Sequence, residues 1–210
     1  MERMKAVLCR MLTAAALALS VVLAPGTEAS AHKSILKVEF AERRELNVLI
    51  DNFALTDQNG GRVEFRKLRG KPLVINFMYT SCPDVCPLLT ASLKILRDHM
   101  KPAEARDIRF LSITTDPEID SPKVLKAYSK RHEADAPNWW WLTGEARELA
   151  PVWQGFGVSV KRLAKGLIEH TTLTVVADAQ GFMRFAYFGS APDPDVLLKD
   201  LRALEKEAAT

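Results

Sequence analysis

Several apolar segments after the N-terminal region have the length and composition of buried strands. Residues 71–79 (KPLVINFMY) and 107–115 (DIRFLSITT) are largely apolar segments rich in β-branched and aromatic side chains. Residues 138–143 (NWWWLT) form a shorter run of the same kind. Residues 170–189 contain two apolar runs around the turn Ala179-Gln180-Gly181. The pattern therefore predicts three single strands followed by a hairpin.

Segments with helical spacing alternate with these strands. After the first strand, apolar residues recur at Leu89, Leu93 and Leu96, and Pro87 lies near the first helical turn, where its missing N–H is tolerated. The second helix follows Asp120 or Ser121, either of which is a suitable N-cap residue. Helices are predicted over residues 87–100, 122–133, 144–157 and 193–208.

An N-terminal hairpin completes the order of elements. Residues 47–65 are extended on both sides of Asn59-Gly60-Gly61, a turn sequence typical of hairpins. The following strand–helix–strand–helix order, with a late hairpin and a last helix, predicts an α/β protein in which parallel strands continue into an antiparallel hairpin. The predicted fold is thioredoxin-like, with a central mixed sheet flanked by helices and an N-terminal β-hairpin.

The first 31 residues have the composition of a secretory signal peptide. A basic segment precedes the apolar residues 11–24 and the small-residue triplet Ala29-Ser30-Ala31, which predicts cleavage before His32. An uncleaved anchor is the alternative, although the apolar stretch is shorter than the roughly 20 residues of a spanning helix. We expect an exported, periplasmic protein that is soluble or anchored by its N-terminal segment. The predicted organisation is a signal peptide (1–31), a tether (32–44) and one thioredoxin-like domain (45–210).

The charge of the chain excludes one class of partner. The formal net charge is +3 and the basic residues are scattered along the sequence. Nucleic-acid binding proteins instead gather Lys and Arg into a patch that replaces counterions on phosphates. We therefore expect no nucleic-acid partner, and contact with a membrane surface only through a partner or an uncleaved anchor.

Two cysteines define the candidate chemistry. Cys9 leaves with the signal peptide, so Cys82 and Cys86 in the stretch YTSCPDVCP are the only thiols of the mature chain. A bridge between residues four apart closes a very small loop and stabilises the fold little. Cys86 lies at a predicted helix N-terminus, where the helix dipole favours the thiolate, which is both the nucleophile and the metal ligand. The pair is thus redox-active or binds a metal, and two thiolates with one imidazole suit three-coordinate copper.

His170 is the candidate third ligand. It directly precedes a buried strand, at a position that abuts the cysteine turn in a thioredoxin-like sheet. His99 and His132 lie late in predicted helices, where exposed or dipole-stabilised side chains are expected. His32 is the first residue after the predicted cleavage site, and its amine and imidazole are a weaker candidate for Cu(II).

The sequence resembles the Sco/SenC family of thioredoxin-fold copper metallochaperones in cytochrome c oxidase assembly. The resemblance covers about residues 53–204. It rests on GKPLVINFMYTSCPDVCP, LSITTDPEIDSP, WLTG and IEHTTLTVVADAQGFMRFAYFG, in that order. It implies that Cys82, Cys86 and His170 are the ligands of copper, as Cu(I) or Cu(II). Glu169-His170 replaces the more usual Asp-His, and Ser81 stands where the family often has a basic residue.

Two functions follow from the same sulfurs. As a metallochaperone, the protein receives copper from an upstream donor and delivers it to the CuA site of cytochrome c oxidase subunit II or to another cuproprotein. As an exported thiol–disulfide oxidoreductase, it uses Cys82 and Cys86 as a redox-active pair to reduce cysteines of that subunit or of another protein. Only copper binding gives His170 a role, and we favour copper delivery, with thiol chemistry as a possible second activity.

Several other residues have structural or functional interpretations. Asp84 either stabilises the turn between the cysteines or contacts a partner. Asp116 is predicted to be a turn residue before a proline, and Asp120 a helix N-cap. The basic residues Lys161, Arg162 and Lys165 are predicted to lie in a solvated loop, and the alternative is that they attract an acidic partner. Trp139 to Trp141 are predicted to pack in the core, and the alternative is that they form a docking surface for a partner.

Overall fold

A mixed six-stranded β-sheet forms the centre of the protein. The structure, a computed structural model, describes residues 41–208. The strand order is β1-β10-β9-β4-β5-β6; β4, β5 and β6 are parallel, whereas β9, β10 and β1 are antiparallel to their neighbours. The strands of this sheet are β1 (Glu42–Leu49), β4 (Leu73–Met78), β5 (Arg109–Thr114), β6 (Trp139–Leu142), β9 (Leu173–Ala177) and β10 (Phe182–Phe188).

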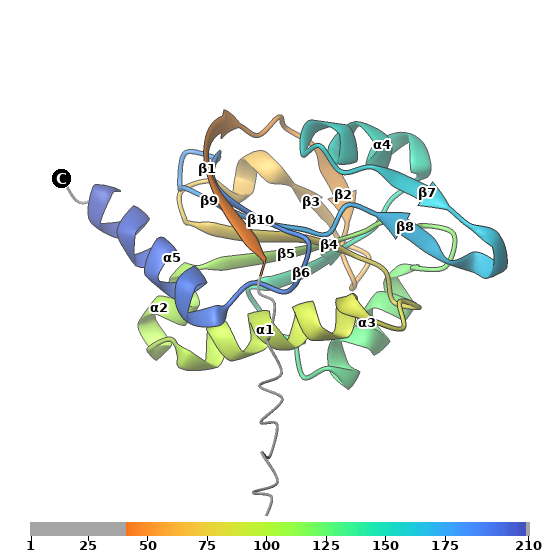
Figure 1. Cartoon of the computed structure of the whole chain (residues 1–210), viewed down its shortest axis with the longest axis horizontal. Helices are drawn as coiled ribbons and strands as arrows, with labels where there is room; N and C mark the ends of the chain where they lie inside the picture. Colours follow the sequence, from red (N-terminus) through yellow and green to blue (C-terminus); the bar gives the residue numbers. More distant parts are fainter. Residues whose placement is uncertain (1–40, 209–210) are drawn as a thin grey trace, which may run out of the picture. The chain divides into compact units, whose positions relative to one another are not determined.

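Helices cover both faces of the sheet (Figure 1). α1, α3 and α5 pack on one face, and α4 lies on the other together with the hairpin of β2 and β3. The helices are α1 (Val85–His99), α2 (Pro102–Asp107), α3 (Pro122–Arg131), α4 (Ala146–Gly155) and α5 (Pro194–Ala208), and the hairpin strands are β2 (Ala54–Thr56) and β3 (Arg62–Glu64). This is the thioredoxin-like α/β fold predicted from the sequence, including the N-terminal hairpin.

The pleat of the sheet divides the core into two layers. On β4, Val74 and Met78 pack with α1, α3 and α5, whereas Ile75 and Phe77 pack with α4 and the hairpin. Alternate residues of a strand point to opposite faces, so a continuously apolar run is buried on both sides. The same alternation buries two of the three tryptophans on one side of β6 and leaves Trp140 half-buried against the other core.

A further hairpin and a short α-helix were not predicted. Residues 160–169 were expected to form a loop, but β7 (Val160–Arg162) and β8 (Ile168–His170) form a separate two-stranded hairpin. The short helix α2 follows Lys101, whose backbone N–H donates to the Glu104 carboxylate at 2.8 Å. Both elements are too short to show a hydrophobic period, so their stability depends on contacts that the linear pattern does not contain.

The first strand begins earlier than expected. Glu42 to Arg44 were assigned to the end of the tether, yet they belong to β1 and pair with β10. Arg43 explains the difference, because its Nε lies 2.6 Å from the buried Asp200 carboxylate on α5, which also accepts the Tyr187 hydroxyl. The predicted signal peptide and the tether up to residue 40 lie outside the described residues. Between residues 41 and 208, no helix is both long and apolar enough to cross a membrane.

Candidate metal centre

The two cysteines flank the turn that joins β4 to α1. Cys82 is half-buried in this turn, Cys86 is buried at the second position of α1, and both are free thiols. Pro87 occupies the next position, where a missing N–H breaks no hydrogen bond because the first helical N–H groups have no partner within the helix. The fold therefore presents one sulfur toward solvent and holds the other beneath it.

Cys82 is the thiolate of the pair. The thiol of Cys86 donates a hydrogen bond to the Cys82 sulfur, which also accepts from the backbone N–H groups of Asp84 and Cys86 and from the Tyr79 hydroxyl. These donors stabilise the negative charge against the cost of burial and lower the pKa of Cys82 to about 5. A half-exposed thiolate at neutral pH can act as a nucleophile or as a metal ligand.

The sequence predicts that the helix N-terminus favours a thiolate at Cys86, whereas in the structure its N–H groups stabilise charge on the Cys82 sulfur. The Cys86 pKa is raised, because its thiol is the donor to Cys82 and because the side chain is buried. The N–H groups at the start of α1 point to the sulfur that precedes the helix, so the helix N-terminus acts on Cys82. A metal that binds both sulfurs must displace the Cys86 proton.

We expect a single thiolate to form when the pH of the reduced protein is raised from acidic to neutral. Ultraviolet thiolate absorption should increase around pH 5 with the amplitude of one thiolate per chain, since Cys82 ionises there and Cys86 keeps its proton. The variant Cys82→Ser should lose this step. A step around pH 9 with the amplitude of two thiolates would contradict the hydrogen-bonded pair described here.

His170 is a neutral imidazole at the end of β8. Burial lowers its pKa, and the Cys82 charge opposes this effect more weakly. Its Nδ1 lies 3.0 Å from the Thr171 carbonyl oxygen, which can only accept, so Nδ1 carries the proton and Nε2 has the free lone pair. The ring lines a hollow of about 320 Å³ together with Ser159, Lys161, Glu169 and Thr171. His170 therefore offers a nitrogen ligand.

Tyr79 connects the cysteine turn to the histidine hairpin. Its ring packs edge-on against His170, with centroids 5.8 Å apart and an interplanar angle of 81°. Its hydroxyl donates to Cys82 and accepts the backbone N–H of Ile168. Sequence analysis did not identify this residue, although its place at the end of the buried strand, three residues before Cys82, was a usable signal.

The candidate ligands lie close to one another, but they are not already arranged around one metal position. Cys82 and Cys86 share a hydrogen bond, and His170 is close enough for the Cys82 charge to act on its pKa. Within residues 41–208, no three His, Cys, Asp or Glu side chains are arranged as a ready-made metal site. The donor set nevertheless fits a soft metal ion: one thiolate, one displaceable thiol proton and one neutral imidazole.

The other residues singled out in the sequence lie outside this donor set. Asp84 is an exposed N-cap residue whose side chain makes no capping bond. His99 lies on the surface, 3.3 Å from Asp195, and His132 packs on the Tyr128 ring. His32 lies outside the described residues.

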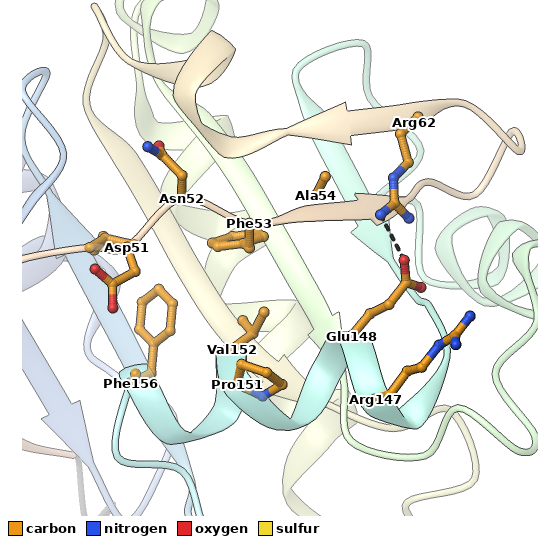
Figure 2. Close-up of a pocket in the computed structure, with 12 residues that line it drawn as sticks. Asp51, Asn52, Phe53, Ala54, Arg62, Arg147, Glu148, Pro151, Val152 and Phe156 are labelled. Atoms are coloured by element: carbon orange, nitrogen blue, oxygen red, sulfur yellow. Dashed lines mark hydrogen bonds and ion pairs between the residues drawn. The ribbon is translucent and has the colours of Figure 1, made fainter.

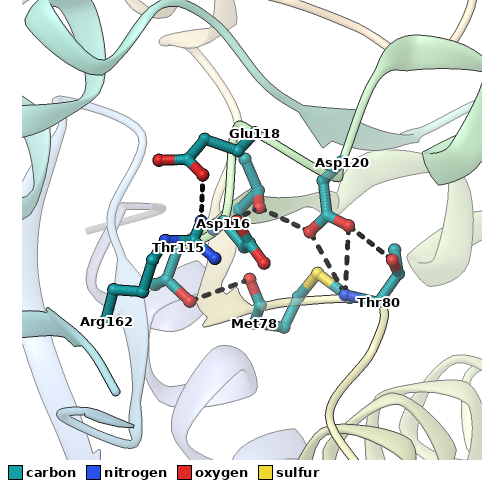
Figure 3. Close-up of polar contacts among 8 residues, drawn as sticks. Met78, Thr80, Thr115, Asp116, Glu118, Asp120 and Arg162 are labelled. Carbon is teal, nitrogen blue, oxygen red and sulfur yellow. Dashed lines mark hydrogen bonds and ion pairs between the residues drawn. The ribbon is translucent and has the colours of Figure 1, made fainter. Parts of the chain in front are cut away.

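Asp120 has a different role from the predicted helix cap. Ser121 precedes α3 as its N-cap. The buried Asp120 carboxylate accepts the backbone N–H and hydroxyl of Thr80 and the hydroxyl of Thr114 (Figure 3). Burial raises the pKa of Asp120, and the charge of Asp116 raises it further. Asp120 therefore holds Thr80 at the start of the cysteine turn.

A separate cavity of about 330 Å³ lies between α4 and the chain leading into β2 (Figure 2). Phe53, Val152 and Phe156 form an apolar wall, and the Arg62–Glu148 ion pair (2.7 Å) borders one end. None of the candidate ligands lines it. The cavity is not part of the candidate metal centre.

The fold and the site define a thioredoxin-like protein with a dithiol at its strand–helix turn and an imidazole on an adjacent hairpin. The SCO1/SenC family model matches residues 41–206. The chain therefore belongs to the SCO1/SenC family. This agrees with the resemblance seen in the sequence.

Individual proteins support the family assignment. The SCO1 protein homolog of Bacillus subtilis is 35% identical over 99 residues, 47% of this chain and 51% of that protein. ScoI of Bradyrhizobium japonicum, solved with copper bound, has a TM-score of 0.66 and 31% identity over 75% of this chain and 99% of that chain. BsSco has a TM-score of 0.67 and 28% identity over 78% of this chain and 96% of that chain. It is described as having a disulfide switch and as a member of the Sco family of cytochrome c oxidase assembly proteins.

Proposed function

We propose that this protein is a copper metallochaperone that binds copper through Cys82, Cys86 and His170. The observation that carries the proposal is the Cys82 thiolate, which is hydrogen-bonded to a second thiol and lies within electrostatic reach of a neutral imidazole. Two sulfurs satisfy Cu(I), and a nitrogen ligand supports Cu(II). The copper-bound state of a family member with the same fold supports copper as the metal.

Delivery follows from the exposure of the site. Cys82 is half-buried and His170 lines a surface hollow, so ligands of an acceptor protein can replace them one at a time. The acceptor in this proposal is the CuA site of cytochrome c oxidase subunit II, or another exported cuproprotein, and an upstream donor supplies the copper. The predicted signal peptide, cleaved or kept as an anchor, supports the periplasm as the location of this exchange. The description of BsSco as an oxidase assembly protein supports the choice of acceptor.

The same pair also supports thiol–disulfide exchange. A low-pKa, half-exposed Cys82 beside a buried Cys86 is the arrangement of an attacking and a resolving thiol. Cys82 would attack an acceptor disulfide, and Cys86 would release the mixed disulfide. The two thiols lose two protons and two electrons, and the acceptor gains them as two thiols. This activity would prepare acceptor cysteines for copper.

Copper titration under anaerobic conditions tests the metal site. We expect the reduced protein to bind one copper per chain and the oxidised protein to bind none, because an intramolecular Cys82–Cys86 disulfide removes both sulfur ligands. Metal content and free-thiol content should be measured on the same samples. Equal copper affinity of the reduced and oxidised forms would show that the thiolates are not ligands, and thiol exchange would become the better account.

A further inference from the structure

The hairpin that carries His170 is not a strand pair of the main sheet. Through Thr171 and Thr172 it leads into β9, and side-chain contacts hold its other parts. Among the strands of residues 41–208, β7 and β8 pair only with each other, with Val160 opposite His170 and Arg162 opposite Ile168. Each strand has three residues, and a two-stranded hairpin of this length is marginally stable by itself. The position of His170 relative to the cysteine turn therefore depends on what anchors this hairpin.

Arg162 is one such anchor. Its guanidinium donates a hydrogen bond to Oδ1 of Asp116 and lies 3.2 Å from the Glu118 carboxylate (Figure 3). The Asp116 side chain is fully buried, and its second oxygen, Oδ2, has no hydrogen-bond partner among the described residues. Burying a carboxylate is costly unless an ion pair or hydrogen bonds compensate it. Release of Arg162 would leave this charge without its cation, so the structure strongly favours the docked hairpin.

The segment that receives Arg162 also holds the cysteine turn. The backbone N–H of Asp116 donates to the Thr114 hydroxyl at 2.9 Å, and that hydroxyl donates to Asp120 at 2.6 Å. Asp120 accepts the backbone N–H of Thr80 at 3.1 Å, two residues before Cys82. Residues 114–120 thus contact both ligand-bearing segments, through Asp120 on the cysteine side and through Asp116 on the histidine side.

We propose that Arg162 is a positioning residue for His170, acting through its ion pair with Asp116. The pair fixes the β7–β8 hairpin beside the cysteine turn and thereby sets the affinity for a metal ion that needs the imidazole. This inference rests on the proposed function, in which His170 is the third ligand. Cu(II) binding should therefore depend on Arg162, whereas Cu(I) binding by the two sulfurs should not.

The variant Arg162→Gln tests this role, with Arg147→Gln as its matched control. Arg147 is an exposed arginine on α4 whose Nε lies 2.8 Å from Glu145, outside the candidate metal centre, so its replacement reports the loss of one arginine charge alone. We expect R162Q to lower Cu(II) affinity about 10- to 100-fold, the range seen when a residue that orients a ligand is removed. Its sulfur-to-copper absorption should shift toward that of His170→Ala. R147Q should keep the wild-type absorption and affinity.

A second variant covers the case in which R162Q does not fold. The double variant D116N/R162Q removes both charges and leaves no buried carboxylate unpaired, so it should fold and still show the Cu(II) defect. Cu(I) affinity should be unchanged in both variants, and R162K should recover part of the Cu(II) affinity.

The outcomes separate this inference from the proposed function. If His170→Ala binds Cu(II) like wild type, His170 is not a ligand and the proposed function fails. A second outcome is that His170→Ala is defective but R162Q binds Cu(II) like R147Q. This result, or the same result for the double variant where R162Q is unfolded, overturns the positioning role of Arg162 alone.

Discussion

Replacement of Cys82 by serine should reduce Cu(I) affinity by more than about 100-fold, since loss of groups that merely orient metal ligands costs about 10- to 100-fold. The variant loses the thiolate that the turn stabilises, and the remaining Cys86 is buried and protonated. A single buried thiol does not provide the linear two-sulfur coordination that satisfies Cu(I). Competition with a chromophoric Cu(I) chelator under anaerobic conditions measures the effect.

Ser81→Ala is the matched control for Cys82→Ser. Ser81 is an exposed neighbour in the same turn, and its replacement keeps both sulfurs. We expect wild-type Cu(I) affinity for this control and unchanged circular dichroism for both variants, because Cys82 is only partly buried. A Cys82→Ser variant that still binds Cu(I) like the control would mean that copper binds elsewhere in the protein.

The strands of the main sheet could be predicted because each is marked by the apolar pattern of its own residues. β4, β5 and β9 are continuous apolar runs, and a run buried on both faces needs no knowledge of its partners. The β7–β8 hairpin could not be predicted, because it depends on an ion pair between Arg162 and Asp116, 46 residues apart. An arginine in a basic run looks like a solvated charge until its buried partner is known.

The candidate site also has features that the local sequence predicts and features that depend on distant contacts. The sequence alone shows the spacing of Cys82 and Cys86 and predicts their position at the start of a helix. Which sulfur carries the charge depends on the direction of a few N–H groups in the turn, and the spacing of the cysteines does not contain this information. The bonds of Asp120 to Thr80 span 40 residues, so the capping interpretation, which uses only neighbouring residues, could not detect them.

His170 is the residue whose replacement best separates the two functions. Dithiol exchange needs only Cys82 and Cys86, whereas a copper site that accepts Cu(II) needs a nitrogen donor. His170 lies outside the cysteine turn, on a surface hairpin. Alanine at this position should therefore leave the fold, the Cys82 thiolate and disulfide formation nearly unchanged.

We expect His170→Ala to retain Cu(I) and to lose at least about 100-fold in Cu(II) affinity, because a direct ligand should cost no less than the 10- to 100-fold typical of orienting residues. The imidazole is neutral and its Nε2 lone pair is free, so its removal deletes a nitrogen donor without changing the charge of the site. Sulfur-to-copper absorption should weaken or shift, and the variant should not restore cytochrome c oxidase in a deletion strain. His99→Ala, which removes an exposed imidazole paired with Asp195, is the matched control and should behave as wild type. If His170→Ala binds both copper states like this control and restores the oxidase, the three-ligand site is wrong, and the protein acts through its two sulfurs alone.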